Sequence, residues 1–182
     1  MTTLIDYFEQ GLTLEQYINQ MKVNKAEMHK IYETFELPED TRLDTVKAKN
    51  LKAIVITEDW CGDAMMNLPV LMKIAEATAM PISIALRDDN PELMDQYLTN
   101  GARSIPVFIF LDDNDTEYTR WGPRAEKVQD YVTDIRKDLP AKDASDFDAK
   151  QKEVHHKIHE KYKNTPEFWN EVYESIMRQL TH

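Results

Sequence analysis

The chain has 182 residues, a length that suits one domain with extensions better than two separate domains. Its 22 Lys and Arg residues against 33 Asp and Glu residues give a formal net charge of −11. This acidic balance argues against binding to nucleic acid or to an anionic membrane surface, since both need a basic face, and we expect the charge to serve solubility.

Residues 1–40 are expected to form a helical N-terminal extension. The segment Thr13-Leu14-Glu15-Gln16 fits a capping box, and Asn24-Lys25-Ala26-Glu27 is a looser match. Apolar residues then recur at the spacing of one helix face, which should pack against the rest of the chain: Met28, Ile31, Tyr32 and Phe35.

Residues 41–138 alternate between strand and helix patterns. Short apolar runs predict strands at 51–57, 82–86 and 106–111, and a turn signal at 112–115 leads into a further strand at 117–121. Helices are expected over 61–78, 91–98 and 124–137. Because the strands are almost continuously apolar, the sheet should be covered on both faces, which is α/β architecture, and the last two strands should form an antiparallel hairpin.

Residues 139–182 read as a second helical extension. Thr165 and Pro166 fit an N-cap followed by proline at the first helical position. An amphipathic stripe runs through the helix behind them: Phe168, Trp169, Val172, Tyr173, Ile176, Met177 and Leu180. We expect the stripe to pack on the main domain, so that all three segments form one compact unit; a homodimer or partner interface through this helix is the alternative.

The cysteine content and the N-terminus bear on the compartment. Cys61 is the only cysteine, so no intramolecular disulfide can form. The first ten residues have neither a basic n-region nor an apolar h-region, and the longest apolar runs are far shorter than a membrane span. We therefore expect a soluble protein of a reducing compartment, with the cytoplasm as the default.

Cys61 stands between a predicted strand and a predicted helix, in the segment Glu58-Asp59-Trp60-Cys61-Gly62-Asp63-Ala64. At a helix start, unpaired backbone N–H groups and the helix dipole favour the thiolate over the thiol. The thiolate is the form that attacks a disulfide sulfur, so the position makes Cys61 a candidate nucleophile.

Trp60, Cys61 and Gly62 resemble the thioredoxin active site, whose usual form is Trp-Cys-Gly-Pro-Cys. Pro69, eight residues after the cysteine, lies where thioredoxins carry the proline that kinks the active-site helix, and Gly122 matches the family's glycine after its last strand. The resemblance covers about residues 45–138. It implies a thioredoxin-like fold, with a central mixed sheet flanked by helices and with helical N- and C-terminal extensions.

Ser104-Ile105-Pro106 precedes a predicted strand as the cis-proline loop of thioredoxins does. The resemblance implies a cis Ile105–Pro106 bond beside an exposed Cys61 sulfur, and a cis X–Pro bond costs only about 0.5–1 kcal/mol. It also implies that Ile105 and Pro106 dock an extended substrate segment, with Trp60, Gly62 and Asp63 completing the substrate-binding surface. The Trp-Cys-Gly-Asp motif and the helical N-terminal extension resemble a bacterial subgroup of the family.

The chain departs from the thioredoxin pattern at three positions. Ala64 stands where the resolving cysteine should be, and Val55 stands where thioredoxins commonly have a buried acid. Asp63 replaces the motif proline, and its carboxylate should raise the thiol pKa. The repulsion between carboxylate and thiolate is roughly 2–3 kcal/mol, and the helix start stabilises the thiolate by about 0.3–1 kcal/mol. Asp63 could instead cap the helix. We expect Cys61 to be less activated than is usual in the family.

Two functions follow from these residues, and a third is weaker. The first is monothiol thiol–disulfide exchange, in which Cys61 attacks a protein or small-molecule disulfide and an external low-molecular-weight thiol, as co-substrate, regenerates it. The second is a redox-inactive binding module that keeps the cleft to hold a peptide or partner. The third is a redox sensor that dimerises through Cys61.

No cofactor or metal is expected. His155 and His159 share a helix face at i,i+4 spacing, but the chain has no HExxH motif and the region has no cysteine, so a convergent third ligand is lacking and the histidines should be solvated.

Overall fold

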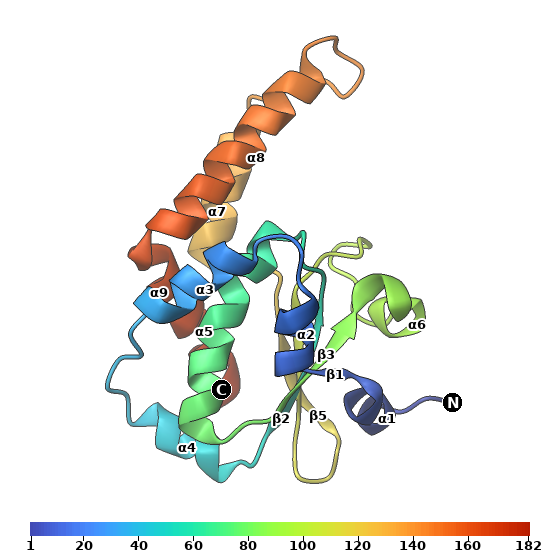
Figure 1. Cartoon of the computed structure of the whole chain (residues 1–182), viewed down its shortest axis with the longest axis vertical. Coiled ribbons are helices and arrows are strands. Elements are labelled where there is room, and N and C mark those ends of the chain that lie inside the picture. The colour runs from blue at the N-terminus through green and yellow to red at the C-terminus, as the bar shows by residue number, and fades with distance from the viewer.

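The computed structural model describes residues 1–182 and has a five-stranded mixed sheet with helices on both faces (Figure 1). The strand order is β1-β3-β2-β4-β5, and β2 and β3 are parallel while the other neighbours are antiparallel. The strands are β1 (Leu12–Thr13), β2 (Lys52–Thr57), β3 (Ile82–Leu86), β4 (Val107–Leu111) and β5 (Glu117–Trp121). The predicted β4–β5 hairpin is confirmed.

The two faces of the sheet bury different sets of side chains, because successive residues of a strand point to opposite faces. On β2, Val55 belongs to the larger core cluster, whereas its neighbours Ile54 and Ile56 belong to the smaller one. On β4, Phe108 and Phe110 alternate in the same way with Ile109. This double burial explains the apolar runs from which the strands were predicted.

Most helices cover the face of the sheet that carries Val55. The helices are α1 (Leu4–Gln10), α2 (Leu14–Gln20), α3 (Lys25–Thr34), α4 (Arg42–Ala48), α5 (Gly62–Thr78), α6 (Pro91–Met94), α7 (Glu126–Arg136), α8 (Phe147–Asn164) and α9 (Pro166–Thr181), with a 3₁₀ turn at Arg87–Asp89. The central helix is α5, which contacts α3, α4, α8 and α9 and contains Pro69. On the opposite face, α6 and the partly buried side chains of α1 complete the smaller cluster. None of the helices is both long enough and apolar enough to cross a lipid bilayer.

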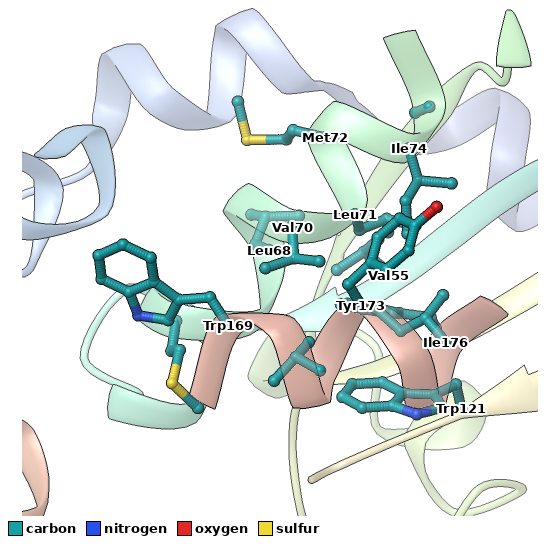
Figure 2. Packing of buried hydrophobic residues seen from close by; sticks show 14 of the residues in the cluster. Val55, Leu68, Val70, Leu71, Met72, Ile74, Trp121, Trp169, Tyr173 and Ile176 are labelled. Atoms are coloured by element: carbon teal, nitrogen blue, oxygen red, sulfur yellow. The ribbon is translucent and has the colours of Figure 1, made fainter. Parts of the chain in front are cut away.

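The apolar stripe of the last helix packs inside the chain, as expected. Figure 2 shows Trp169, Tyr173 and Ile176 of α9 packed with residues of α5 and with Trp121 of β5, and each of the three α9 side chains is at most 3% exposed. Trp121 Nε1 also donates a hydrogen bond of 2.8 Å to Ser175 Oγ. The buried face of α9 is therefore the one that the sequence predicted to pack on the main domain.

The structure also contains two elements that the sequence did not predict. Residues 1–40 are not helical throughout, because they include β1, which pairs with β3 at the edge of the sheet. Helix α4 lies between this extension and β2. The capping box at Thr13 is confirmed, but Asn24 makes no capping hydrogen bond and adopts a left-handed backbone with φ 62°. Helix α6 ends at Met94, four residues before the predicted end.

Candidate functional site

Cys61 is the N-cap of α5. Strand β2 ends at Thr57, a turn is closed by the 3.3 Å hydrogen bond from Cys61 N to Glu58 O, and the helix begins at Gly62. The Cys61 Sγ accepts a hydrogen bond from the backbone N–H of Ala64 at 3.4 Å. The sulfur therefore takes the place of the Ser or Asp oxygen that usually satisfies a free N–H at a helix start.

The segment before β4 lies against this sulfur. The Ile105–Pro106 peptide bond is cis, and the Cys61 thiol donates to the carbonyl oxygen of Ile105 at 3.4 Å. Gly122 packs closely on the same segment: it has φ 133°, and a Cβ built there would lie 2.2 Å from the Pro106 carbonyl oxygen. Only glycine fits this contact, which accounts for the residue after β5 that the sequence singled out.

The expectation that the Cys61 sulfur is exposed is wrong. Cys61 is 8% exposed and belongs to the smaller core cluster, together with Ala64 and Ile105. Its neighbour Trp60 is 49% exposed, and the guanidinium of Arg87 lies 4.8 Å from the centre of the indole ring. Of the two residues, only Trp60 presents a large surface to solvent.

The burial of Cys61 governs its acidity. Burial is the main cause that raises the pKa of the Cys61 thiol from its ordinary 9.0 to about 11, and the carboxylate of Asp63 raises it further. The N–H groups of Ala64 and Asp63 and the charge of Arg124 lower it by less. The sequence identified the repulsion from Asp63 correctly, but it could not show the larger effect of burial.

The other two acids of the segment, Glu58 and Asp59, each bind a backbone N–H group of a neighbouring segment. Asp59 Oδ2 accepts the backbone N–H of Lys22 at 2.8 Å, and Glu58 Oε2 accepts that of Asp88 at 3.0 Å. These two carboxylates hold neighbouring segments in place.

Asp63 does not cap the helix. Its carboxylate forms a two-point ion pair with Arg124, with both N–O distances at 2.9 Å, and its Oδ1 accepts the hydroxyl of Tyr162 at 2.7 Å. Both members of the ion pair are largely buried, with side-chain exposures of 13% and 16%. The residue thus links the start of α5 to the loop before α7 and to α8.

The loop that carries Arg124 is itself fixed from α5. Asn67, fully buried one turn after Asp63, donates its side-chain amide to the carbonyl of Pro123 at 2.8 Å. Arg124 also donates to Gln129 Oε1 at 2.9 Å on α7. These contacts hold the guanidinium beside the start of α5.

Helix α8 lies beside the site and lines its cavity, a role that the sequence did not predict. Ile158 and Tyr162 are buried against the domain, and His159 Nε2 lies 3.0 Å from Asn24 Oδ1. Asn24 in turn donates to the backbone carbonyl of Asp59 at 3.1 Å. The apolar residues four apart on this helix were the available signal, but they could not identify the surface on which the helix packs.

A cavity of about 390 Å³ remains between α8 and the start of α5. Its walls come from the active-site segment, from Arg124, from Arg136 on α7 and from α8; the lining residues are Trp60, Cys61, Gly62, Asp63, Arg124, Arg136, His155, Ile158, His159 and Tyr162. Burial lowers the pKa of both histidines. No group of three or more His, Cys, Asp or Glu side chains is placed to hold a metal ion.

The structure brings together Cys61, Asp63 and Ile105, with Pro106 in the cis bond behind Ile105 and Trp60 at the surface. Val55 is buried in the core, and Ala64 offers no second thiol. A disulfide formed on Cys61 can therefore be resolved only by a thiol from outside the chain.

Comparison with known proteins gives the family. A family profile described as thioredoxin matches residues 11–136, from the start of β1 to the end of α7. The chain is 29% identical over 87 residues to a thioredoxin H-type 1 of Nicotiana tabacum, covering 48% of this chain and 68% of that protein. It is 27% identical over 81 residues to a thioredoxin of Rhodospirillum rubrum, covering 43% of this chain and 75% of that one.

Two solved structures resemble the whole chain. A protein of unknown function from Pseudomonas aeruginosa superposes with a TM-score of 0.63 at 15% identity, covering 97% of this chain and 98% of that one. An HIV epitope-scaffold gives a TM-score of 0.65 at 15% identity, covering 96% and 95%. At such identity the likeness concerns the fold alone. The sheet, its flanking helices and the family match confirm the predicted thioredoxin-like α/β fold with helical extensions.

Proposed function

Because this chain belongs to the thioredoxin family, we propose that it carries out monothiol thiol–disulfide exchange through Cys61, with an external thiol as the resolving partner. The observation that carries the proposal is the position of Sγ. It lies between the Ala64 N–H at the start of α5 and the Ile105 carbonyl, at the wall of a cavity.

The reaction balances without a cofactor. The Cys61 thiol loses its proton, and the thiolate attacks one sulfur of a disulfide RSSR, so that the S–S bond breaks, a Cys61–S–S–R bond forms and RS⁻ leaves and takes up a proton. An external thiol then attacks the mixed disulfide, restores the Cys61 thiol and leaves as the new disulfide. The substrate disulfide is the oxidant and the external thiol the reductant.

The raised pKa of the Cys61 thiol determines how fast the exchange reaction should be at neutral pH. With a pKa of about 11, about one thiol in 10⁴ is ionised at pH 7, against about one in 100 for an ordinary value of 9.0. The more basic thiolate is about tenfold more nucleophilic, which recovers part of the loss. Cys61 should therefore react about tenfold more slowly than an unhindered thiol, and the protein is a slow exchanger at neutral pH.

The test is formation and removal of a Cys61 adduct. The full chain is incubated at pH 8 with the neutral disulfide bis(2-hydroxyethyl) disulfide, and intact mass is followed before and after addition of glutathione. We expect an adduct that forms on the wild type, is absent from Cys61→Ser and disappears with glutathione. If no adduct forms on the folded chain while the urea-unfolded chain reacts, exchange through Cys61 is ruled out.

A second candidate is a redox-inactive interaction module, and the burial of Cys61 is the observation that favours it. A thiol that is 8% exposed and mostly protonated can serve as a small hydrophobic packing residue. This reading requires that the folded chain fails the adduct test and that Cys61→Ala keeps the stability and partner binding of the wild type. The redox sensor is disfavoured by the same burial, because two Cys61 side chains that are each buried within their own chain cannot form a disulfide without local opening.

The finer placement of the chain is also a proposal. The Trp-Cys-Gly-Asp motif, with Ala64 in place of a second cysteine, supports membership of the bacterial subgroup with helical extensions. We propose cytoplasmic action, where small thiols are available for the resolving step. The buried contacts of α8 and α9 support treating residues 1–40, 41–138 and 139–182 as one unit.

A further inference from the structure

The cavity beside Cys61 has one unbalanced positive charge, that of Arg136, in a strongly acidic protein. The chain has a formal charge of −11, yet Asp63 is the one acidic residue among those lining the cavity, and Arg124 pairs with it. The second arginine of the lining, Arg136, makes no ion pair and no side-chain hydrogen bond within the chain. His155 lies near enough for the charge of Arg136 to contribute to its lowered pKa, after burial. Arg136, which is exposed to solvent and has no ion-pair partner within the chain, thus lines the cavity that borders the sulfur.

The cover over Cys61 decides what can enter. Figure 1 shows α7 and α8 as a helical pair that projects beyond the sheet, with the lower part of α8 lying over the domain. This part of α8 is held by the Tyr162–Asp63 hydrogen bond, by the His159–Asn24 contact and by the buried Ile158. Because Cys61 is only 8% exposed, a small disulfide that enters the cavity is better suited to reach it than a disulfide on the surface of a folded protein. The cavity of about 390 Å³ falls within the range that holds small ligands.

We propose that this cavity binds a small disulfide or mixed disulfide that carries a carboxylate, with the carboxylate on Arg136 and a sulfur at Cys61. The inference rests on the proposed exchange function and names its substrate class. Arginine suits this task because its planar, permanently charged guanidinium can bind a carboxylate through two parallel hydrogen bonds. The imidazole of His155 supplies a further polar group at the same wall. Arg136 ends α7 of the thioredoxin-like domain and His155 lies on α8, so the C-terminal extension takes part in selecting the substrate through His155.

The experiment uses three symmetrical disulfides of similar size that differ in charge. These are 3,3′-dithiodipropionate, bis(2-hydroxyethyl) disulfide and cystamine, which are anionic, neutral and cationic at pH 8. The rate of Cys61 adduct formation is measured on the full chain for each, and is divided by the rate on the urea-unfolded chain to remove differences in leaving group. We expect the anionic disulfide to react about tenfold faster than the neutral one after this normalisation, against the net charge of the protein, and cystamine to react slowest.

Arg136→Gln should reduce the anionic-to-neutral ratio about five- to tenfold, and 0.5 M NaCl should reduce it in the wild type because salt screens the attraction. The matched control is Arg178→Gln, which removes the same charge from the exposed surface of α9 outside the cavity. It should keep the wild-type ratio. Equal normalised rates for all three disulfides, or the same ratio in both variants, would overturn the substrate class and leave the exchange function standing. Absence of any adduct would overturn both.

Discussion

Asp63 connects three segments of the site that are far apart in the sequence. It pairs with Arg124 from the loop before α7 and accepts the hydroxyl of Tyr162 from α8. The same carboxylate raises the pKa of Cys61, second only to burial. A proline at this position could neither pair with Arg124 nor bind Tyr162, and it would not raise the pKa of Cys61. Asp63 therefore links α5 to α8 in the C-terminal extension, and it makes the thiol less acidic.

Asp63→Asn is predicted to lower stability and to activate the thiol at the same time. Loss of the carboxylate leaves Arg124 largely buried without its ion-pair partner, which should cost about 2–3 kcal/mol of unfolding free energy. Loss of the negative charge lowers the pKa of Cys61, so the variant should alkylate faster at pH 8 than the wild type. Urea denaturation and iodoacetamide kinetics measure the two effects.

Asp134→Asn is the matched control, because Asp134 is exposed on α7 and pairs with Lys137 at the surface. It should change stability by less than about 0.5 kcal/mol and leave the alkylation rate unchanged. If Asp63→Asn slowed alkylation, the electrostatic role given to this residue would be wrong.

The sequence sufficed for the position of Cys61 but not for its environment. The strand-to-helix transition around residue 61 follows from local patterns, as do the apolar strand β2 and the helix α5. The burial of Cys61 depends on residues far away in the chain, such as Leu93, Tyr97 and Ile105 of the smaller core cluster, and no local pattern encodes which distant segments meet at a helix start. Val55 and Ala64 show the opposite case, since their side chains alone establish that no buried acid and no second thiol is present at these positions.

Helices α8 and α9 both follow the residues matched by the family profile, and α8 is the one of the two that lines the cavity beside Cys61. Tyr162→Phe removes the hydroxyl that holds α8 to Asp63 and keeps the buried ring. We predict a loss of about 1.5–3 kcal/mol of unfolding free energy, as for a hydrogen bond to a charged group. Faster alkylation of Cys61 should accompany it, since α8 is held less firmly. Unchanged stability and an unchanged alkylation rate would show that this contact does not hold the cover in place.

Helix α9 contributes through burial, and Ile176→Ala tests it. Ile176 is 0% exposed and packs in the larger core cluster with α5, so the truncation should cost about 2–5 kcal/mol. Asn170→Ala on the exposed side of the same helix is the control and should change stability by less than about 0.5 kcal/mol. Equal, small effects in a denaturation experiment would mean that α9 is not part of the core.

The elements that sequence patterns did not reveal are short or depend on distant partners. Strand β1 has two residues and exists because its backbone pairs with β3, about 70 residues later. Helix α4 has seven residues and a single buried side chain, Val46, so it lacks the repeated apolar spacing that identifies longer helices. Asn24 was expected to cap α3, but its side chain binds Asp59 and His159 instead.

At the scale of the whole molecule, the extensions and the thioredoxin-like domain share one core. The larger cluster has 33 buried residues and runs from Tyr17 near the N-terminus to Leu180 near the C-terminus. We predict a single cooperative unfolding transition, in which far-UV circular dichroism and tryptophan fluorescence coincide. Trp60→Phe leaves Trp121 on β5 and Trp169 on α9 as reporters of the domain and the extension. A helical signal that is lost before the fluorescence changes would show that the extensions unfold separately.

The proposed exchange requires a Cys61 sulfur that is buried and mostly protonated and yet open to small molecules through the cavity. The rate of Cys61 alkylation by iodoacetamide between pH 7 and pH 11, on the folded and the urea-unfolded chain, tests this directly. We predict that the folded chain reacts about tenfold more slowly than the unfolded one at pH 7, and that its rate rises through pH 10 toward a midpoint near 11, because the rate follows the thiolate fraction. A plateau reached by pH 8, or a folded chain that fails to react at any pH, would contradict it.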